Sequence, residues 1–324
     1  HAPRYDLPVS ATTKSGSHPL GRGREYWTYL RAYDLATGKL AWQAESPTSV
    51  HSTSVLGKLP DGTHAILTGR GGGHKPPEEP YGLSLLDSAN GKRFWDAAIK
   101  DYPAAQNASW NKRSACFFHG KEHRSLDIQT GKPGKVVSLV EGVTLTLWEN
   151  GRYVTRKNQT RPKARKPITY FTNLIAGDYH YFRAFGGFLI SRVHLTTSQV
   201  EYLQVPAQLD DAGEMVWNRT VPNDMKNADG YTATQDKRNA GSGWGHVSAA
   251  CPVIVGDRMY MPTMVGTVYV INWRSKVLNQ DALVSVSSLG PAGKTWTLSS
   301  LAHADGRLFA RTLKELICLG EVSQ

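Results

Sequence analysis

The sequence predicts an all-β fold, a β-propeller of four-stranded antiparallel blades, and three observations lead to this prediction. A motif recurs in residues 31–43, 85–95 and 125–132, where an apolar strand runs into Asp and, four residues on, into Gly-Lys. Fainter strand–turn–strand copies continue to residue 319. The units repeat roughly every 40–50 residues, and no convincing amphipathic helix separates them. This combination is typical of a propeller.

The Asp and Gly of the motif predict a tight hairpin. The recurring residues are Asp34, Asp87 and Asp127, with Gly38, Gly91 and Gly131. An Asp side chain at a strand end accepts a backbone N–H and starts a turn, while Gly supplies the positive φ that the turn needs. Trp42 and Trp95 follow four residues after the first two glycines, and we expect both to pack as flat wedges in successive units.

The remaining copies set the expected number of blades. Strand pairs are expected in residues 172–182, 192–203, 251–271 and 302–319. Residues 172–182 and 192–203 belong to one unit, so these copies form three units and make six together with the three motifs. The strand-like residues 143–148 indicate a further blade in 141–168. We therefore expect seven blades, with six and eight as alternatives.

The motif Ala-x-Asp-x-x-Thr-Gly-Lys-x-x-Trp at residues 32–42 resembles the repeat of the PQQ-like β-propeller family. The resemblance extends over roughly residues 25–320 and implies a single propeller domain preceded by an irregular arm, residues 1–24. Loop insertions are expected at about residues 69–82, 152–168 and 209–245.

The resemblance implies a fold more than an activity, because the family includes quinoprotein dehydrogenases, outer-membrane assembly lipoproteins and sensor domains. The dehydrogenases have a longer, eight-bladed body and often an adjacent cysteine pair beside the cofactor. Here Cys116, Cys251 and Cys318 are far apart, and the calcium ligands and catalytic Asp of those enzymes match no position. We therefore predict no cofactor, with PQQ and calcium as the alternative.

The formal net charge of +11 favours anionic partners. Much of this charge lies in one basic segment, which contains Arg152, Arg156, Lys157, Arg161, Lys163, Arg165 and Lys166. The segment is either a solvated loop or a docking site for an anionic polysaccharide or a membrane surface. Specific nucleic-acid binding would need a recognition helix or a stacking platform, and the sequence predicts neither.

Other candidate ligand-binding residues come from loops and strand starts. Arg70 and His74 belong to the Gly- and Pro-rich insertion at 69–82, while His51 and His246 precede strands that would line a central channel. Converging imidazoles suit a transition metal, but no HxH or HExxH spacing supports one, so we predict no metal. Trp244 flanks the carboxylate-rich insertion 209–245, whose composition fits a glycan-binding cleft.

Taken together, these features favour a non-catalytic, periplasmic or extracellular propeller that binds a protein or an anionic glycan. The location follows from the resemblance; no signal peptide is recognised in the sequence, and no apolar run approaches the length of a membrane-spanning helix. We expect a monomer. The alternative is a PQQ- or metal-dependent oxidoreductase with its site at the mouth of the channel.

Overall fold

The computed structural model describes residues 27–49, 53–71, 78–102, 108–161, 168–170, 172–247 and 250–320. The chain divides into two compact units. The first contains residues 1–105 and 129–131, and the second contains residues 106–128 and 132–324. Both units are built from antiparallel sheets of propeller type, and the short helix α1 (Trp244–Val247) is the one α-helix of the described ranges. Accordingly, no helix in these ranges is long and apolar enough to cross a membrane.

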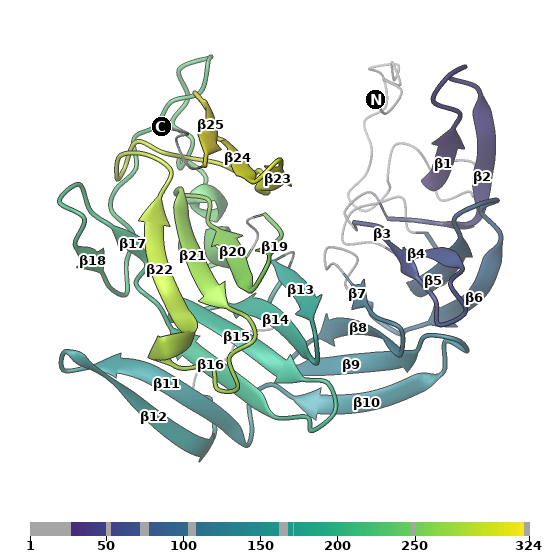
Figure 1. Ribbon diagram of the computed structural model, residues 1–324, viewed down its shortest axis with the longest axis horizontal. Helices are drawn as coiled ribbons and strands as arrows, with labels where there is room; N and C mark the ends of the chain where they lie inside the picture. Colours follow the sequence, from purple (N-terminus) through teal and green to yellow (C-terminus); the bar gives the residue numbers. More distant parts are fainter. Residues whose placement is uncertain are drawn as a thin grey trace, which may run out of the picture. The chain divides into compact units, whose positions relative to one another are not determined.

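The first unit contains a hairpin and one complete blade (Figure 1). The hairpin pairs β1 (Tyr29–Tyr33) with β2 (Leu40–Pro47). The blade is a meander of β3 (Val55–Lys58), β4 (His64–Arg70), β5 (Gly82–Asp87) and β6 (Arg93–Ala98), in sequence order. The central strands β4 and β5 are largely buried, which agrees with the apolar residues Ala65–Leu67 of β4 and the three leucines of β5.

The second unit begins with two further blades. One is formed by β7 (Ser109–Trp110), β8 (Ser114–His119), β9 (Glu122–Asp127) and β10 (Pro133–Ser138). The other is formed by β13 (Asn173–Ala176), β14 (Tyr179–Ala184), β15 (Leu189–His194) and β16 (Val200–Gln204). The hairpin of β11 (Val143–Glu149) and β12 (Arg152–Gln159) adds to the latter, because β11 pairs in parallel with β16 and gives a six-stranded sheet.

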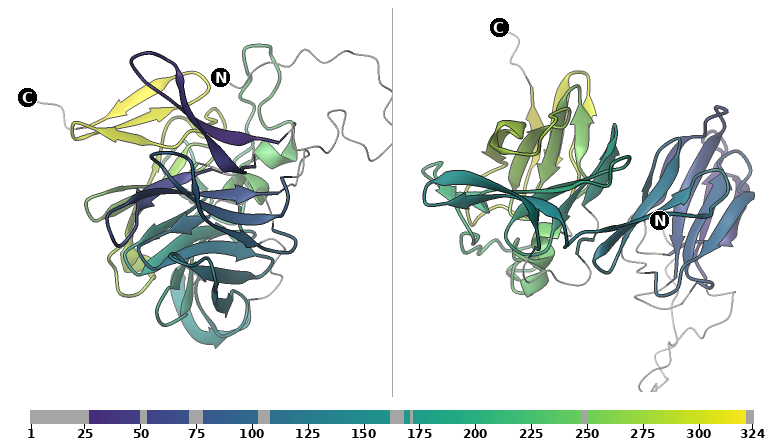
Figure 2. Two further views of the ribbon diagram at one scale, coloured as in Figure 1. Left: turned by 90° about the vertical axis from the view of Figure 1, so that its right-hand side faces the viewer. Right: turned by 90° about the horizontal axis from the view of Figure 1, so that it is seen from below.

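The rest of the second unit holds three more sheets. The short hairpin is β17 (Gln208–Leu209) and β18 (Met215–Val216), and the 3-10 turn η2 (Lys237–Asn239) precedes α1. The next blade is β19 (Val253–Val255), β20 (Arg258–Pro262), β21 (Thr267–Asn272) and β22 (Leu283–Ser288), with the turn η3 (Gln280–Ala282) before its last strand. The last sheet is β23 (Ala302–Ala304), β24 (Arg307–Arg311) and β25 (Leu316–Leu319), drawn in yellow in Figure 2.

The prediction of seven blades is wrong, since the described residues form five sheets of three or more strands. Of the segment 141–168, the described residues 141–161 do not make a blade of their own, because β11 pairs with the edge strand β16 from Thr144 to Thr146. This pairing satisfies the open edge of a neighbouring blade. The first motif likewise forms only the β1–β2 hairpin.

The motif turns form as expected. The N–H of Gly38 donates to the carbonyl of Asp34 at 2.8 Å, and that of Gly91 donates to the carbonyl of Asp87 at 2.9 Å. Their φ angles are 68° and 72°, and φ of Gly131 is 67°. A Cβ at Gly91 would lie 2.6 Å from the Trp42 ring, and one at Gly131 would lie 2.7 Å from the Trp95 ring. Each Trp therefore packs on the motif glycine of the next sequence repeat.

The main core of the second unit lies between the β13–β16 and β19–β22 blades. Its buried members include Tyr181, Ile190, Leu203, Met259, Met261, Tyr269 and Ile271. Full burial of one such side chain contributes about 1.5–3 kcal/mol. Packing between these side chains holds the two blades together.

Candidate anion-binding site

Three arginine side chains are fully buried in the described part of the chain, namely Arg70, Arg183 and Arg192. A buried guanidinium is stable only when a carboxylate or many acceptors compensate its charge. The three arginines differ in whether the protein supplies that compensation, and this difference identifies the candidate site.

Arg70, which the sequence suggested as a ligand-binding residue, is compensated within its own blade. Its Nη1 lies 2.7 Å from Oδ1 of Asp96, and its Nε donates to the carbonyl of Pro80 at 2.7 Å. Nη2 donates to the carbonyl of Ala97 at 3.1 Å. Burial lowers the pKa of Arg70, and the charge of Asp96 opposes that effect. Arg70 thus has a carboxylate partner within the protein, and its role in ligand binding stays a prediction.

Arg192 is compensated in the same way. Its Nε donates to Glu201 Oε2 at 2.6 Å, and its Nη1 donates to the Tyr181 hydroxyl at 2.9 Å. The carbonyls of Ser275 and Lys276 accept further hydrogen bonds at 2.7 and 2.9 Å. This arginine thus links the end of the β19–β22 blade to β15.

Arg183, on β14, has no such partner. Its Nη2 donates to Thr172 Oγ1 at 3.3 Å, whereas its Nε and Nη1 are buried with no hydrogen-bond partner among the described residues. Desolvation lowers the pKa of Arg183 to about 10, so the group is still charged at neutral pH. Arg183 therefore carries a buried positive charge without a carboxylate from the described part of the protein.

Arg161 and His246 join Arg183 in what we call the cationic cluster. Arg161 is 5% exposed and His246 is 2% exposed. Nη2 of Arg161 donates to the carbonyls of Phe185 and Gly186, while Nη1 has no partner in the described ranges. The guanidinium of Arg161 lies 5.0 Å from the centre of the Tyr202 ring. Burial lowers the pKa of Arg161 as well.

His246 faces the same region from helix α1. Its Nε2 lies 3.5 Å from the carbonyl oxygen of Leu189, and its buried Nδ1 makes no hydrogen bond to the described residues. Burial holds the pKa of His246 well below its usual value, and the charges of Arg183 and Arg161 lower it further. The imidazole is therefore neutral at neutral pH.

The turn between β14 and β15 brings these side chains together. Gly186 and Gly187 adopt φ angles of 75° and 78°, and Phe188 adopts 50°, so the chain reverses sharply. The reversal presents carbonyls to Arg161 and His246. Thr172 donates its N–H and its hydroxyl to the carbonyl of Val247, which fixes α1 against the start of β13.

This arrangement can bind an anion. Three guanidinium nitrogens, Nε and Nη1 of Arg183 and Nη1 of Arg161, have no acceptor among the described residues, and a carboxylate, sulfate or phosphate oxygen would satisfy them with charge-assisted hydrogen bonds. His246 does not contribute a donor, because its Nε2 faces the Leu189 carbonyl and Nδ1 of the neutral ring carries a lone pair. No ion pair from the described residues competes for Arg161 or Arg183.

The other predicted site residues are dispersed. Arg152, Arg156 and Lys157 lie on strand β12, not in the loop expected at 152–168, and all three are exposed. Arg156 donates to both carboxylate oxygens of Glu149, at 2.6 and 2.7 Å. Residues outside the described part are His51, His74, Lys163, Arg165, Lys166 and the side chain of Trp244.

The sequence reasoning identified Arg161 and His246 but missed Arg183. The sequence held an indication of this buried charge, because Arg183 directly follows the aromatic run Tyr-His-Tyr-Phe in the buried strand β14. A charged residue in a buried strand requires a partner, and that requirement is readable from sequence.

The carboxylate-rich insertion 209–245 lines a separate cleft of about 600 Å³. Its walls include Tyr231, Asp236 and Asn239 from the insertion and Trp296 from beyond it. Tyr231 is largely exposed. The cleft combines polar groups with two aromatic side chains, and glycan binding there stays a prediction.

No protein-family profile and no curated protein matches the chain. Among solved structures, the computationally designed Ika8 protein is 9% identical with a TM-score of 0.46, covering 91% of this chain and 65% of that chain. BamB from Moraxella catarrhalis is 16% identical with a TM-score of 0.32, covering 90% and 88%. The Cps50 (Swd1) β-propeller domain from Myceliophteria thermophila is 14% identical with a TM-score of 0.41, covering 81% and 62%.

The chain spans less than two thirds of the length of the designed protein and of the Cps50 domain. These likenesses concern the fold and assign no activity, substrate or partner to the chain. The resemblance of its motifs to the PQQ-like repeat stays a prediction, because no family profile matches.

Proposed function

We propose that the protein is a non-catalytic binding scaffold that anchors an anionic group of its ligand at the cationic cluster. The observation that carries this proposal is the contrast among the buried arginines. Arg70 and Arg192 each have a carboxylate within 2.7 Å, and Arg183 has none among the described residues. The ligand supplies the counter-charge that the fold omits.

The energetics support this reading. A buried charge without compensation costs several kcal/mol, and buried N–H groups without acceptors cost about 1–3 kcal/mol each. A protein that keeps such a group forgoes stability that a hydrophobic side chain would provide. Binding an anion recovers this free energy, so the strain in the free protein becomes affinity for the ligand.

The proposed ligand is an acidic glycan or an acidic segment of a protein. The net charge of +11 and the exposed cations on β12 attract either one over long range. The cleft beside Tyr231 and Trp296 favours the glycan, because it offers aromatic surface together with polar groups. A periplasmic or extracellular location belongs to this proposal and rests on the PQQ-like resemblance.

Calorimetric titration with a uronic-acid oligosaccharide tests the proposal, and a neutral oligosaccharide of equal length serves as the control ligand. We expect saturable binding of the acidic sugar and at least a tenfold loss of affinity in Arg183→Met, which corresponds to about 1.4 kcal/mol. The matched control is Arg152→Gln, which removes one exposed charge from β12.

A glutamate-rich peptide replaces the sugar in a second arm, so that protein and glycan ligands are told apart. Equal affinity of wild type and Arg183→Met for every anionic ligand would overturn the proposal. Equal losses in Arg183→Met and Arg152→Gln would also overturn it, because the binding would then follow net charge alone.

A further inference from the structure

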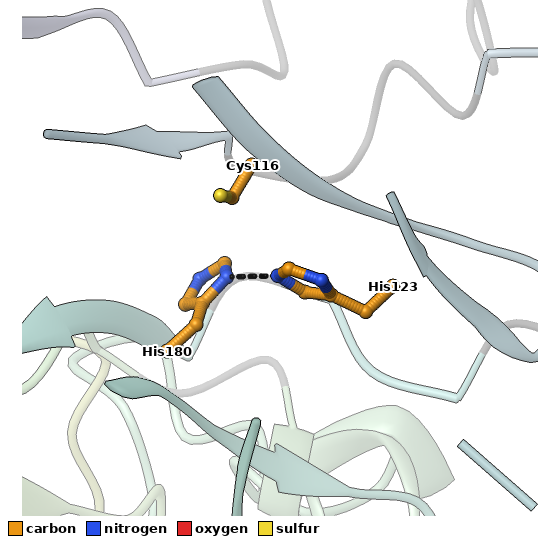
Figure 3. Close-up of side chains that lie close together, drawn as sticks. All are labelled: Cys116, His123 and His180. Carbon is orange, nitrogen blue, oxygen red and sulfur yellow. Dashed lines mark hydrogen bonds between the residues drawn. The ribbon is translucent and has the colours of Figure 1, made fainter. Parts of the chain in front are cut away.

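A second cluster of functional side chains lies apart from the cationic cluster, where the β7–β10 blade meets the β13–β16 blade. Cys116 of β8, His123 of β9 and His180 of β14 point toward one another (Figure 3). Their potential ligand atoms all lie within 4.8 Å of one another, and the three side chains are buried. Two nitrogens and one sulfur form a donor set typical of zinc and related ions.

A hydrogen-bond network orients His180 as a ligand. Nδ2 of Asn173 donates to the carbonyl of Tyr170 at 3.2 Å, so Oδ1 of Asn173 faces the other way. This oxygen accepts from Ser109 Oγ at 2.9 Å and lies 3.0 Å from His180 Nε2. His180 therefore carries its proton on Nε2, which leaves the lone pair of Nδ1 directed at His123 and Cys116.

Such a contact is what a metal-binding histidine makes with its second nitrogen. It fixes the tautomer and the direction of the ring before any metal arrives. His123 Nε2 lies 3.0 Å from His180 Nδ1, and in the metal-free protein it donates its proton to that nitrogen. The ring of Phe118 packs on both histidines, with centroids 5.4 and 4.7 Å away, and holds them in place.

The cluster also has an approach from outside the core. A cavity of about 230 Å³ is lined by Cys116 and His123, with Asp127 and His194 among its other walls. An ion can enter through this cavity, and its fourth coordination position would face the same space. Charges of both signs line this cavity, Asp127 together with Arg113 and Lys135, so the donor atoms and not the net charge of the walls would select the ion.

We propose that Cys116, His123 and His180 bind a divalent transition-metal ion, Zn²⁺ in the first instance, with the fourth position open to this cavity. Zn–N bonds of about 2.0–2.1 Å and a Zn–S bond of about 2.3 Å require the sulfur of Cys116 to move about 1 Å closer to the histidine nitrogens. Those two nitrogens lie 3.0 Å apart and need only separate slightly. On binding, the Cys116 thiol releases its proton to solvent, and the proton on His123 Nε2 is replaced by one on Nδ1.

Burial explains why the site is neutral before the metal binds. Desolvation lowers the pKa of His123 to about 4 and raises the pKa of the Cys116 thiol to about 12. A metal ion supplies the positive charge that stabilises the Cys116 thiolate in these buried surroundings.

Cobalt is the probe for this site, because Co²⁺ accepts the same ligands as zinc and absorbs visible light. The chelator-treated full chain is titrated with Co²⁺ and then with Zn²⁺. We expect one Co²⁺ per chain, tetrahedral absorption bands and a thiolate-to-cobalt charge-transfer band, all displaced by an equivalent of Zn²⁺. Failure to bind one ion per chain would overturn the proposal.

Substitutions identify the residues that bind Co²⁺ and the cysteine that gives the charge-transfer band. The matched control is Cys251→Ser with Cys318→Ser, which leaves Cys116 as the one cysteine of the three and should keep every band. Cys116→Ser should lose the charge-transfer band, and His180→Gln should weaken Co²⁺ binding at least tenfold. Loss of the band in the double control, or its persistence in Cys116→Ser, would refute the site.

The double control keeps the test decisive even if Cys116→Ser fails to fold. In that variant any thiolate band must come from Cys116. Zinc should also raise the midpoint of thermal unfolding of the wild type and of the double control, and a zinc effect missing from both would contradict the proposal.

Discussion

The buried arginines show how one residue type serves two purposes in this chain. Arg192 and Glu201 form an ion pair at 2.6 Å inside the protein, with both side chains nearly inaccessible to solvent. Arg183 is equally buried and has only Thr172 as a side-chain partner in the described residues. The same substitution should therefore change the free energy of unfolding differently at the two positions.

Arg192→Met should lower the free energy of unfolding by about 3–5 kcal/mol, because it leaves the Glu201 carboxylate buried and unpaired. Arg183→Met should leave it unchanged or raise it by about 1–3 kcal/mol, since it removes an uncompensated charge and keeps the apolar volume. Urea denaturation of both variants checks this. A loss in Arg183→Met as large as that in Arg192→Met would show that Arg183 is compensated internally.

Glu78 gives a pH-dependent prediction. Its side chain is 1% exposed, and desolvation raises its pKa to about 7 from 4.5. The folded state holds this proton where the unfolded state has lost it, so Glu78 costs stability progressively as pH rises from 4.5 to about 7. Glu78→Gln removes that cost, and its benefit should be near zero at about pH 4 and about 1–3 kcal/mol at about pH 8.

Denaturation of wild type and Glu78→Gln across this pH range measures the effect. Glu79→Gln changes the same charge at an exposed neighbouring position and is the matched control. A benefit of Glu78→Gln that does not vary with pH would contradict the assigned pKa shift.

Among the elements, the motif hairpins are the parts whose geometry depends on single glycines. Gly38 and Gly91 have nearly the same φ, yet a Cβ at Gly38 meets nothing within 4 Å, and one at Gly91 meets the Trp42 ring at 2.6 Å. Comparing an alanine substitution at Gly38 with one at Gly91 separates the cost of backbone strain from the cost of disturbed packing.

Gly38→Ala should therefore lower the free energy of unfolding by about 1–2 kcal/mol, the cost of a left-handed non-glycine residue. Gly91→Ala should cost about 1–3 kcal/mol more, because Trp42 must also move. Chemical denaturation, read through tryptophan fluorescence, measures both changes. Equal costs for the two variants would mean that Trp42 adjusts freely and does not hold the units together.

Strand β12 lies where the sequence predicted a loop. The two prolines that follow it suggested a loop from residue 152, but residues 152–159 pair with β11. The parallel pairing of β11 with the distant strand β16 supports this hairpin, and neighbouring residues along the chain do not encode such a pairing.

For the whole molecule, the net charge of +11 predicts salt-sensitive association with polyanions. Binding to a sulfated polysaccharide should weaken steadily as salt shortens the Debye length from about 10 Å at 0.1 M to about 3 Å at 1 M. Replacing the exposed Arg152 and Lys157 with Gln should reduce this salt dependence. Arg183→Met should lower affinity at every salt concentration, because a buried contact is screened less. The same dependence of affinity on salt in the wild type, the Arg152 and Lys157 variant and Arg183→Met would contradict the distinct roles of the exposed and buried cations.

The sequence by itself determined the all-β propeller type, the hairpin at each motif and the packing role of Trp42 and Trp95, whereas the structure showed that each Trp packs on the motif glycine of the next repeat. These features depend on turn chemistry and strand periodicity, which act over a few residues. The number of blades, the cationic cluster and the cysteine–histidine cluster were decided by the tertiary structure. Arg161, Arg183 and His246 meet only through the β14–β15 turn and helix α1, and Cys116, His123 and His180 meet only where two blades pack. Burial and charge compensation depend on residues far apart in the chain, and long-range packing alone brings those residues together.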